Sequence, residues 1–201
     1  MGRFFRKRAS VLTLSLAVFL LDQLIKLIVV YKMPLSESHT AVIQVLGDFL
    51  QIIHVRNEGA LFSLGAHWPK ILRIILFKVL PVLVIGWLAV VISTTPEQQA
   101  RIFHLKNIPH EEFTAAGRWA ASLIVGGGFG NIVDRVFRPE GVVDFLDFKF
   151  YGLFGLDRWP TFNIADASIV IGMVLLLYFS LFHNRKHKKK SKTHKKKVHK
   201  H

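Results

Sequence analysis

The chain has 201 residues, of which 51% are hydrophobic and none is cysteine. This composition is too apolar for a disordered chain, and it excludes disulfide frameworks, thiolate metal sites and thiol nucleophiles. The formal net charge of +14 lies at the two ends, because 3–8 and 183–201 contain fourteen basic residues and no acidic one. A neutral apolar body between two basic ends indicates a membrane protein and not a nucleic-acid-binding one.

Four apolar segments are long enough to form transmembrane helices. The second segment contains Arg73 and Lys78, whose long side chains are expected to reach toward the membrane surface. The third segment is the least hydrophobic. The sequence thus predicts an all-α integral membrane protein, with one membrane domain over 1–182, a disordered basic tail over 183–201, and helices at about 11–30, 71–92, 115–133 and 164–182.

The basic residues at both ends predict the orientation of these helices. Lys and Arg near membrane spans favour the cytoplasmic side, so we expect both termini and the loop 93–114 in the cytoplasm. Segments 31–70 and 134–163 then lie on the outer face, where we expect a small extramembrane element that includes some β structure. Asp22 and Lys26 interrupt the end of the first apolar segment, which argues against a cleaved signal peptide there.

Charged residues inside a span need a partner or a function. Asp22 and Lys26 are four residues apart and share one face of the first helix. The pair is either a structural ion pair between helices or a direct part of a site, and the sequence leaves both open. In the third span, Gly126 and Gly130 have the spacing that allows close helix packing. Asn131, Asp134 and Arg135 follow at its outer end, where an ion pair between the last two is one simple role.

Two further motifs place carboxylates on the outer face. Asp144 and Asp147 lie among apolar neighbours in 142–148, and burial of a carboxyl group raises its pKa. The fourth span begins with Asn163 and Asp166, whose spacing is also that of an ordinary helix cap. Together with Asn57 in the first outer segment, these polar residues predict a site at the outer membrane surface.

The residue types at this face favour one kind of chemistry. The histidines outside the tail have no metal-ligand spacing, and no serine lies in a nucleophile motif, so we expect neither a metal nor an organic cofactor. Two carboxyl groups that share one proton can activate water for amide hydrolysis. The spacing alone does not decide between Asp134, Asp144 and Asp147 as a member of the pair.

Five motifs in the chain resemble those of the bacterial lipoprotein signal peptidases (signal peptidase II). They are 22–26 (DQLIK), 57–63 (NEGALFS), 126–135 (GGGFGNIVDR), 142–145 (VVDF) and 162–166 (FNIAD). The resemblance covers 11–182 and implies an aspartic endopeptidase of the cytoplasmic (inner) membrane, active on its outer side. Such an enzyme cuts the signal peptide from a diacylglyceryl-modified prolipoprotein just before the lipidated cysteine.

The resemblance also implies roles for individual residues. Asp144 and Asp166 would be the catalytic pair. Asp22, Lys26 and Asp134 would support the site. The implied partners are the prolipoprotein and membrane phospholipid, without nucleic acid, and the implied state is a monomer. Residues that would bind or orient the substrate are Asn57, Gly127, Asn131, Arg135 and Asn163.

The chain departs from the family pattern in a few places. Leu61 and Gly128 stand where the family usually has Ala, and 149–159 is a longer insert in which we expect an outer hairpin or helix. The basic tail is not part of the pattern and either binds anionic cytoplasmic lipid or is inert. The alternative function is a non-enzymatic lipid-binding or transport protein. It predicts repeats or broken helices, neither of which is visible in the sequence.

Overall fold

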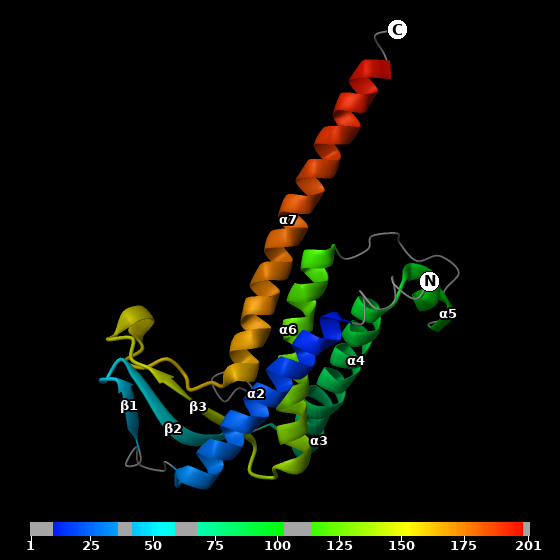
Figure 1. The fold of residues 1–201 in the computed structure, drawn as a ribbon. Coiled ribbons are helices and arrows are strands. Elements are labelled where there is room, and N and C mark those ends of the chain that lie inside the picture. Colours follow the sequence, from blue (N-terminus) through cyan, green and yellow to red (C-terminus); the bar gives the residue numbers. More distant parts are fainter. Residues whose placement is uncertain (1–9, 36–41, 59–67, 103–113, 199–201) are drawn as a thin grey trace.

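The structure is a computed structural model that describes residues 10–35, 42–58, 68–102 and 114–198. Each of the four predicted apolar segments is helical (Figure 1). Three helices in the described part of the chain are long and apolar enough to cross a membrane, and α6 is not among them. The helices are α2 (Val11–Lys32), α3 (Lys70–Ile74), the π-helical η2 (Ile75–Val79), α4 (Leu80–Ser93), α5 (Pro96–Ile102), α6 (Ala115–Phe137) and α7 (Ile164–Val198).

Helix α6 lies at the centre of the helical bundle and packs against α2, α4 and α7. This position explains its lower hydropathy, because its buried residues are mostly small: they include four glycines, two alanines and one serine between Ala120 and Gly130, beside Gly117. Small residues allow helix backbones to approach closely. The helix ends at Phe137 and not near 133 as predicted, so it also carries Asp134 and Arg135.

Glycines provide the contact surfaces of α6. A Cβ atom added to Gly126 would lie 2.5 Å from the Ser15 carbonyl oxygen on α2. A Cβ atom on Gly127 would overlap the Ala165 carbonyl oxygen at the start of α7. Side chains at these two positions would therefore push α2 and α7 away from α6.

Gly127→Ala is expected to destabilise the protein by about 1–3 kcal/mol, because the added methyl group meets backbone that cannot move freely. Thermal unfolding in detergent measures the effect. Gly128→Ala is the matched control, since its Cβ atom would meet only the end of the Ile85 side chain, which can rotate. Equal unfolding temperatures for the two variants would contradict this account.

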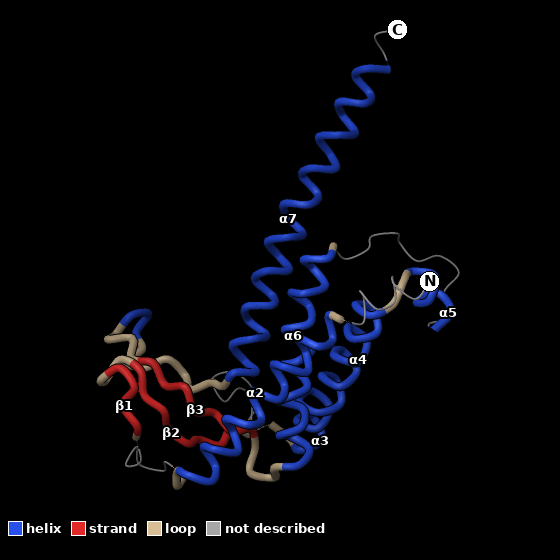
Figure 2. Tube along the Cα trace, viewed as in Figure 1, coloured by secondary structure: helices blue, strands red, loops and turns tan. Residues whose placement is uncertain are grey.

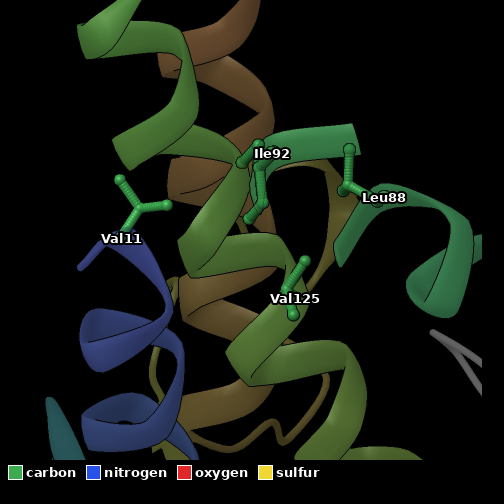
Figure 3. Packing of buried hydrophobic residues seen from close by; sticks show 5 residues of the cluster. Val11, Leu88, Ile92 and Val125 are labelled. Carbon is green, nitrogen blue, oxygen red and sulfur yellow. The ribbon is translucent and has the colours of Figure 1, made fainter. Parts of the chain in front are cut away.

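An apolar cluster joins α2, α4 and α6 at the end of the bundle near Val11. Figure 3 shows Val11, Leu88, Ile92 and Val125 converging from these three helices. Ile92 is completely buried and Val11 is 3% exposed. The cluster fixes the helices at the end opposite to the polar residues described below.

Three strands form a small sheet from the two segments in which the sequence predicts some β structure. They are β1 (Ile43–Leu46), β2 (Leu50–Asn57) and β3 (Val142–Phe148), antiparallel and in the order β1-β2-β3. Figure 2 shows the sheet beside the end of the bundle where α7 begins. A second apolar cluster, made of Val29, Met33, Val143 and Phe145, attaches β3 to α2. The sheet is thereby held at a fixed place relative to the helices.

The insert 149–159 and the tail both contain helical structure. An antiparallel bridge between Lys149 and Arg158 closes the insert, which contains the short 3-10 helix η3 (Leu153–Gly155), in line with the expected hairpin or helix. The prediction of a disordered tail from His183 differs from the structure, in which α7 continues to Val198. Lys is a good helix former, and no Gly or Pro between 173 and 198 interrupts the helix.

Candidate active site

Asp144 lies on β3 with its side chain buried against β2 and α7. Its Oδ2 atom accepts a hydrogen bond of 2.9 Å from Asn57 Nδ2, and its Oδ1 atom accepts one of 2.7 Å from Asn163 Nδ2. Only 2% of the residue is exposed. Burial, together with the negative charge of Asp166, raises the pKa of Asp144 to about 7. The carboxyl group is therefore able to hold a proton at neutral pH.

Asp166 lies in the first turn of α7. Its Oδ1 atom accepts a hydrogen bond of 2.7 Å from Asn131 Nδ2 on α6. Asp166 also takes part in the helix cap that the sequence allows, because its backbone N–H donates to Asn163 Oδ1 at 2.9 Å. The cap and a place in the site are thus compatible, since the cap uses the oxygen of Asn163 and leaves its amide nitrogen for Asp144.

The asparagines connect the two carboxyl groups. Asn163 Nδ2 also lies 3.2 Å from Asn131 Oδ1 and 3.3 Å from the Val143 carbonyl oxygen. Asn131 Oδ1 in turn accepts a hydrogen bond of 3.0 Å from Lys26 Nζ. Because Asn131 Oδ1 accepts these bonds, Asn131 Nδ2 faces Asp166 and donates to its carboxylate.

A fully buried ion cluster lies behind the asparagines. Lys26 Nζ is 2.8 Å from Asp22 Oδ2 on its own helix and 2.8 Å from Asp134 Oδ2 on α6. Asp22 Oδ1 accepts the backbone N–H of Ala165 at 3.0 Å, and Asp134 Oδ2 accepts that of Val143 at 3.3 Å. The cluster therefore ties α2 and α6 to the residues adjoining Asp144 and Asp166.

For Asp22 and Lys26, this geometry favours the structural ion pair over a direct place in the site. Neither residue lines the cavity described below; they pair with each other within α2, and Lys26 also pairs with Asp134 on α6, so that the ion cluster bridges two helices. Asp134 pairs with Lys26 and with Arg138 one turn later, and so does not depend on the adjacent Arg135 that the sequence suggested. Adjacent residues on a helix do not face each other, whereas residues four apart do.

A cavity of about 410 Å³ brings the predicted residues together. Asp144 and Asp166 both line it, although they come from different elements. Much of its remaining wall is apolar and comes from α4, α6 and α7, including Leu80, Val84, Ile124 and Ile169. The polar lining residues, apart from the two carboxylates, are Asn57, Asn131, Arg135 and Thr161.

Several predicted residues are outside this lining, and they include the three buried members of the ion cluster, Asp22, Lys26 and Asp134. Asn163 is buried and contacts Asp144 from behind, and Gly127 faces the Ala165 backbone. Asp147 is oriented away and pairs with Arg158 Nε at 2.7 Å on the sheet. Residues 59–63 of the second motif, including Leu61, lie outside the described residues.

Sequence reasoning missed three contributors. Gln23 Nε2 bonds both Asp22 and Asp134, and Arg138 pairs with Asp134. Thr161 lines the cavity. The spacing of four residues between Asp134 and Arg138 was a signal for Arg138, but the predicted helix ended near 133, before both residues. No comparable signal marked Gln23 or Thr161.

Comparisons with known proteins agree with these motifs. Residues 14–182 match the family model described as "Signal peptidase (SPase) II". The chain is 42% identical over 171 residues to the "Lipoprotein signal peptidase" of Borreliella afzelii (strain PKo), covering 85% of this chain and 89% of the relative. It is 40% identical over 163 residues to the protein of that name from Treponema pallidum (strain Nichols), covering 81% and 78%.

Two solved structures have the same fold. One, "Bacterial membrane enzyme structure by the in meso method at 2.3 A resolution", has a TM-score of 0.62 and 27% identity, covering 90% of this chain and 92% of its own. The other, with the same wording and 1.9 A resolution, has a TM-score of 0.61 and 26% identity, covering 86% and 93%. Both matches cover most of the chain.

Proposed function

Since the chain belongs to the signal peptidase II family, we propose that it cleaves the signal peptide from diacylglyceryl-modified prolipoproteins by an aspartate pair, Asp144 and Asp166. One observation carries the assignment of this pair: the two carboxyl groups come from β3 and α7 but line a single cavity. Separate asparagine amides hold them there.

The proposed chemistry uses one proton shared between the two aspartates. Asp166 in its ionised form accepts a proton from water as the water oxygen attacks the scissile carbonyl carbon. Asp144 in its protonated form donates its proton to the carbonyl oxygen. When the tetrahedral intermediate collapses, Asp166 gives its proton to the leaving amine, and Asp144 regains one from the hydroxyl group. The products are a signal peptide with a new carboxylate and a lipoprotein with a free amine on its lipidated cysteine.

The cavity wall supports a role for the neighbouring residues in orienting the substrate. Asn57 and Arg135 line the cavity next to the carboxyl groups, where they can bind peptide carbonyl groups. The apolar wall from α4, α6 and α7 is suited to the apolar signal peptide and acyl chains. Asn131 and Asn163 orient the two aspartates, and the Lys26 cluster supports these asparagines.

We place this site on the outer face of the bacterial cytoplasmic membrane. The proposal includes four spans, with α6 as the third helix to cross, and both termini in the cytoplasm. It is supported by the basic segments at the two ends and by the position of the sheet, which lies at the end of the bundle away from the basic tail. The alternative of a non-enzymatic lipid-binding or transport protein has no support from the relatives.

The test is cleavage of a purified diacylglyceryl-modified prolipoprotein by the full-length protein, followed by gel shift. We expect cleavage of the lipid-modified substrate, no cleavage of the same protein without the lipid, and no effect of a chelator. Loss of cleavage with chelator would point to a metal mechanism. Equal cleavage of both substrates would contradict the proposed specificity.

Activity is expected to decline as the pH rises above about 7. A raised carboxyl pKa means that Asp144 keeps its proton up to about that pH and loses it beyond, after which it can no longer donate to the carbonyl oxygen. The dependence of kcat/KM on pH, measured with one substrate from pH 6 to 9, checks this. A flat profile through pH 9 would show that the reaction does not need the Asp144 proton.

A further inference from the structure

A second cavity, of about 310 Å³, lies next to the one that holds the aspartates. The two share Asn57, Phe77 and Arg135 as lining residues. The charged residues of the second cavity are mostly of one sign. Five cations and one carboxylate line it, namely Lys70, Arg73, Lys78, Arg135, Arg138 and Glu58.

The residues that the structure describes neutralise only part of this positive charge. Arg73 pairs with Glu58 at 2.6 Å, and Arg138 pairs with Asp134. Arg135 interacts electrostatically with Asp166 and Asp144. Lys70 and Lys78, in contrast, form no ion pair or hydrogen bond with any residue in the part of the chain that the structure describes. With respect to the described residues, Lys70 and Lys78 are therefore available to a ligand.

The position of Lys78 indicates how deep that ligand reaches. Lys78 is eight residues beyond Lys70 in the helical segment 70–93, which corresponds to about 12 Å along a helix. It belongs to the π-helical turn η2, and such turns are frequent at functional sites. An ammonium group inside an apolar span is unfavourable unless it reaches water or an anion.

The surroundings of the cavity are apolar on the membrane side. Ile71 and Ile75, on the same helical segment as the two lysines, are 74% and 48% exposed. Phe77 lines the cavity itself and stacks on Trp68, with ring centroids 6.1 Å apart. The site thus offers cations next to an exposed apolar surface, which suits a molecule with an anionic head and hydrocarbon chains.

We propose that this second cavity binds the phosphate group of an anionic phospholipid from the outer leaflet, with Lys70 and Lys78 as its main ligands. The leaflet follows from the orientation in the proposed function. The acyl chains would lie along the exposed isoleucines. An acidic peptide segment outside the membrane would account for Lys70 but not for Lys78 inside the span, which is why we favour a lipid. A lipid bound here would complete the wall that both cavities share.

The experiment measures lipid retention by the purified full-length protein with native mass spectrometry. The protein in detergent is incubated with phosphatidylglycerol or with zwitterionic phosphatidylcholine. The variant is Lys70→Gln with Lys78→Gln; both side chains are exposed, and thermal unfolding verifies the fold. Lys32→Gln is the matched control, because Lys32 is also exposed at the sheet end of α2 but does not line the cavity.

We expect the parent to retain phosphatidylglycerol in preference to phosphatidylcholine, and the double variant to retain about tenfold less of it, with Lys32→Gln like the parent. Millimolar inorganic phosphate should not displace the lipid.

Three results would overturn the proposal. The first is an equal loss in Lys32→Gln, which would indicate general surface charge. The second is displacement by inorganic phosphate, which would indicate a site for the free ion. The third is unchanged lipid retention by the double variant. If the double variant also cleaves a substrate with acidic residues after the cleavage site more slowly than the parent does, the cavity binds peptide and not lipid. Because the readout is lipid retention and not cleavage, failure here is distinguishable from failure of the proposed function.

Discussion

Asp144→Asn and Asp166→Asn are each expected to lower cleavage by at least about 10³-fold, because either change removes a group that must gain or lose a proton in every turnover. Asparagine has nearly the shape of aspartate, so the fold and the apolar cavity wall are kept. Initial rates on a diacylglyceryl-modified prolipoprotein measure the loss, and thermal unfolding in detergent verifies that each variant is folded.

Asp147→Asn is the matched control for the aspartate pair. Asp147 is as buried as Asp144, at 2% exposure, and lies on the same strand, but it does not line the cavity. Its partner Arg158 also pairs with Asp48, so that the guanidinium keeps an anion when Asp147 becomes neutral. We expect Asp147→Asn to cleave at close to the parent rate. Normal cleavage by Asp144→Asn or Asp166→Asn, or loss of it in Asp147→Asn, would refute the assignment.

Lys26→Met is expected to destabilise the protein by about 3–5 kcal/mol. The substitution leaves Asp22 and Asp134 buried without their shared cation. When one partner of a buried ion pair is removed, the desolvation free energy of the remaining charge is no longer compensated. The unfolding transition in a denaturing detergent titration measures the change. Lys32→Met on the same helix is the control, since Lys32 is exposed and its loss should change stability by less than about 0.5 kcal/mol.

A second variant separates charge from packing. If the unpaired carboxylates cause the loss, Asp22→Asn in the Lys26→Met background should recover part of the stability, because one uncompensated charge is removed. No recovery, or a Lys26→Met protein as stable as the parent, would show that the ion cluster does not hold the helices together.

The spans were the most predictable part of the fold. Apolar length alone places helices at 11–30, 71–92 and 164–182, and the structure has helices there. Their ends differ little from the prediction, except that α7 continues to Val198. The central helix α6 was harder, because a helix surrounded by other helices uses glycine and alanine for close contact and so has lower hydropathy. Its full length, to Phe137, was not visible from hydropathy.

The sheet could be anticipated but not its pairing. Strands β2 and β3 are separated by more than 80 residues, and the register that sets Val55 opposite Asp144 depends on the helices between them.

The second cavity could not be predicted from the sequence either. Arg73 and Lys78 were noticed as charges in the second span, but their proximity to Arg138 follows only from the packing of that span against α6.

For the candidate site, residue identity was more predictable than residue contacts. Motif resemblance selected Asp144 over Asp147, and the structure gives a physical reason for the distinction, because only Asp144 faces the cavity. The double use of Asn163, as helix cap and as a donor to Asp144, could not be predicted. A helix cap and a site residue have the same sequence pattern. Only the structure shows that the amide oxygen of Asn163 caps α7 while its amide nitrogen donates to Asp144.

The spacing of the buried ions has a consequence for how the chain enters the membrane during synthesis. Asp22 pairs with Lys26 on α2, and Asp134 on α6 pairs with Arg138, which directly follows that helix; the two residues of each pair are four positions apart. In the proposed four-span topology, each helix would therefore have its own counterion before the other has been translated, and would insert without a net charge from these residues. Only when α6 arrives, more than 100 residues after α2, does Lys26 gain Asp134 as a second partner. With that topology, the cluster that fixes the bundle would be assembled from two parts that are each neutral when they enter the bilayer.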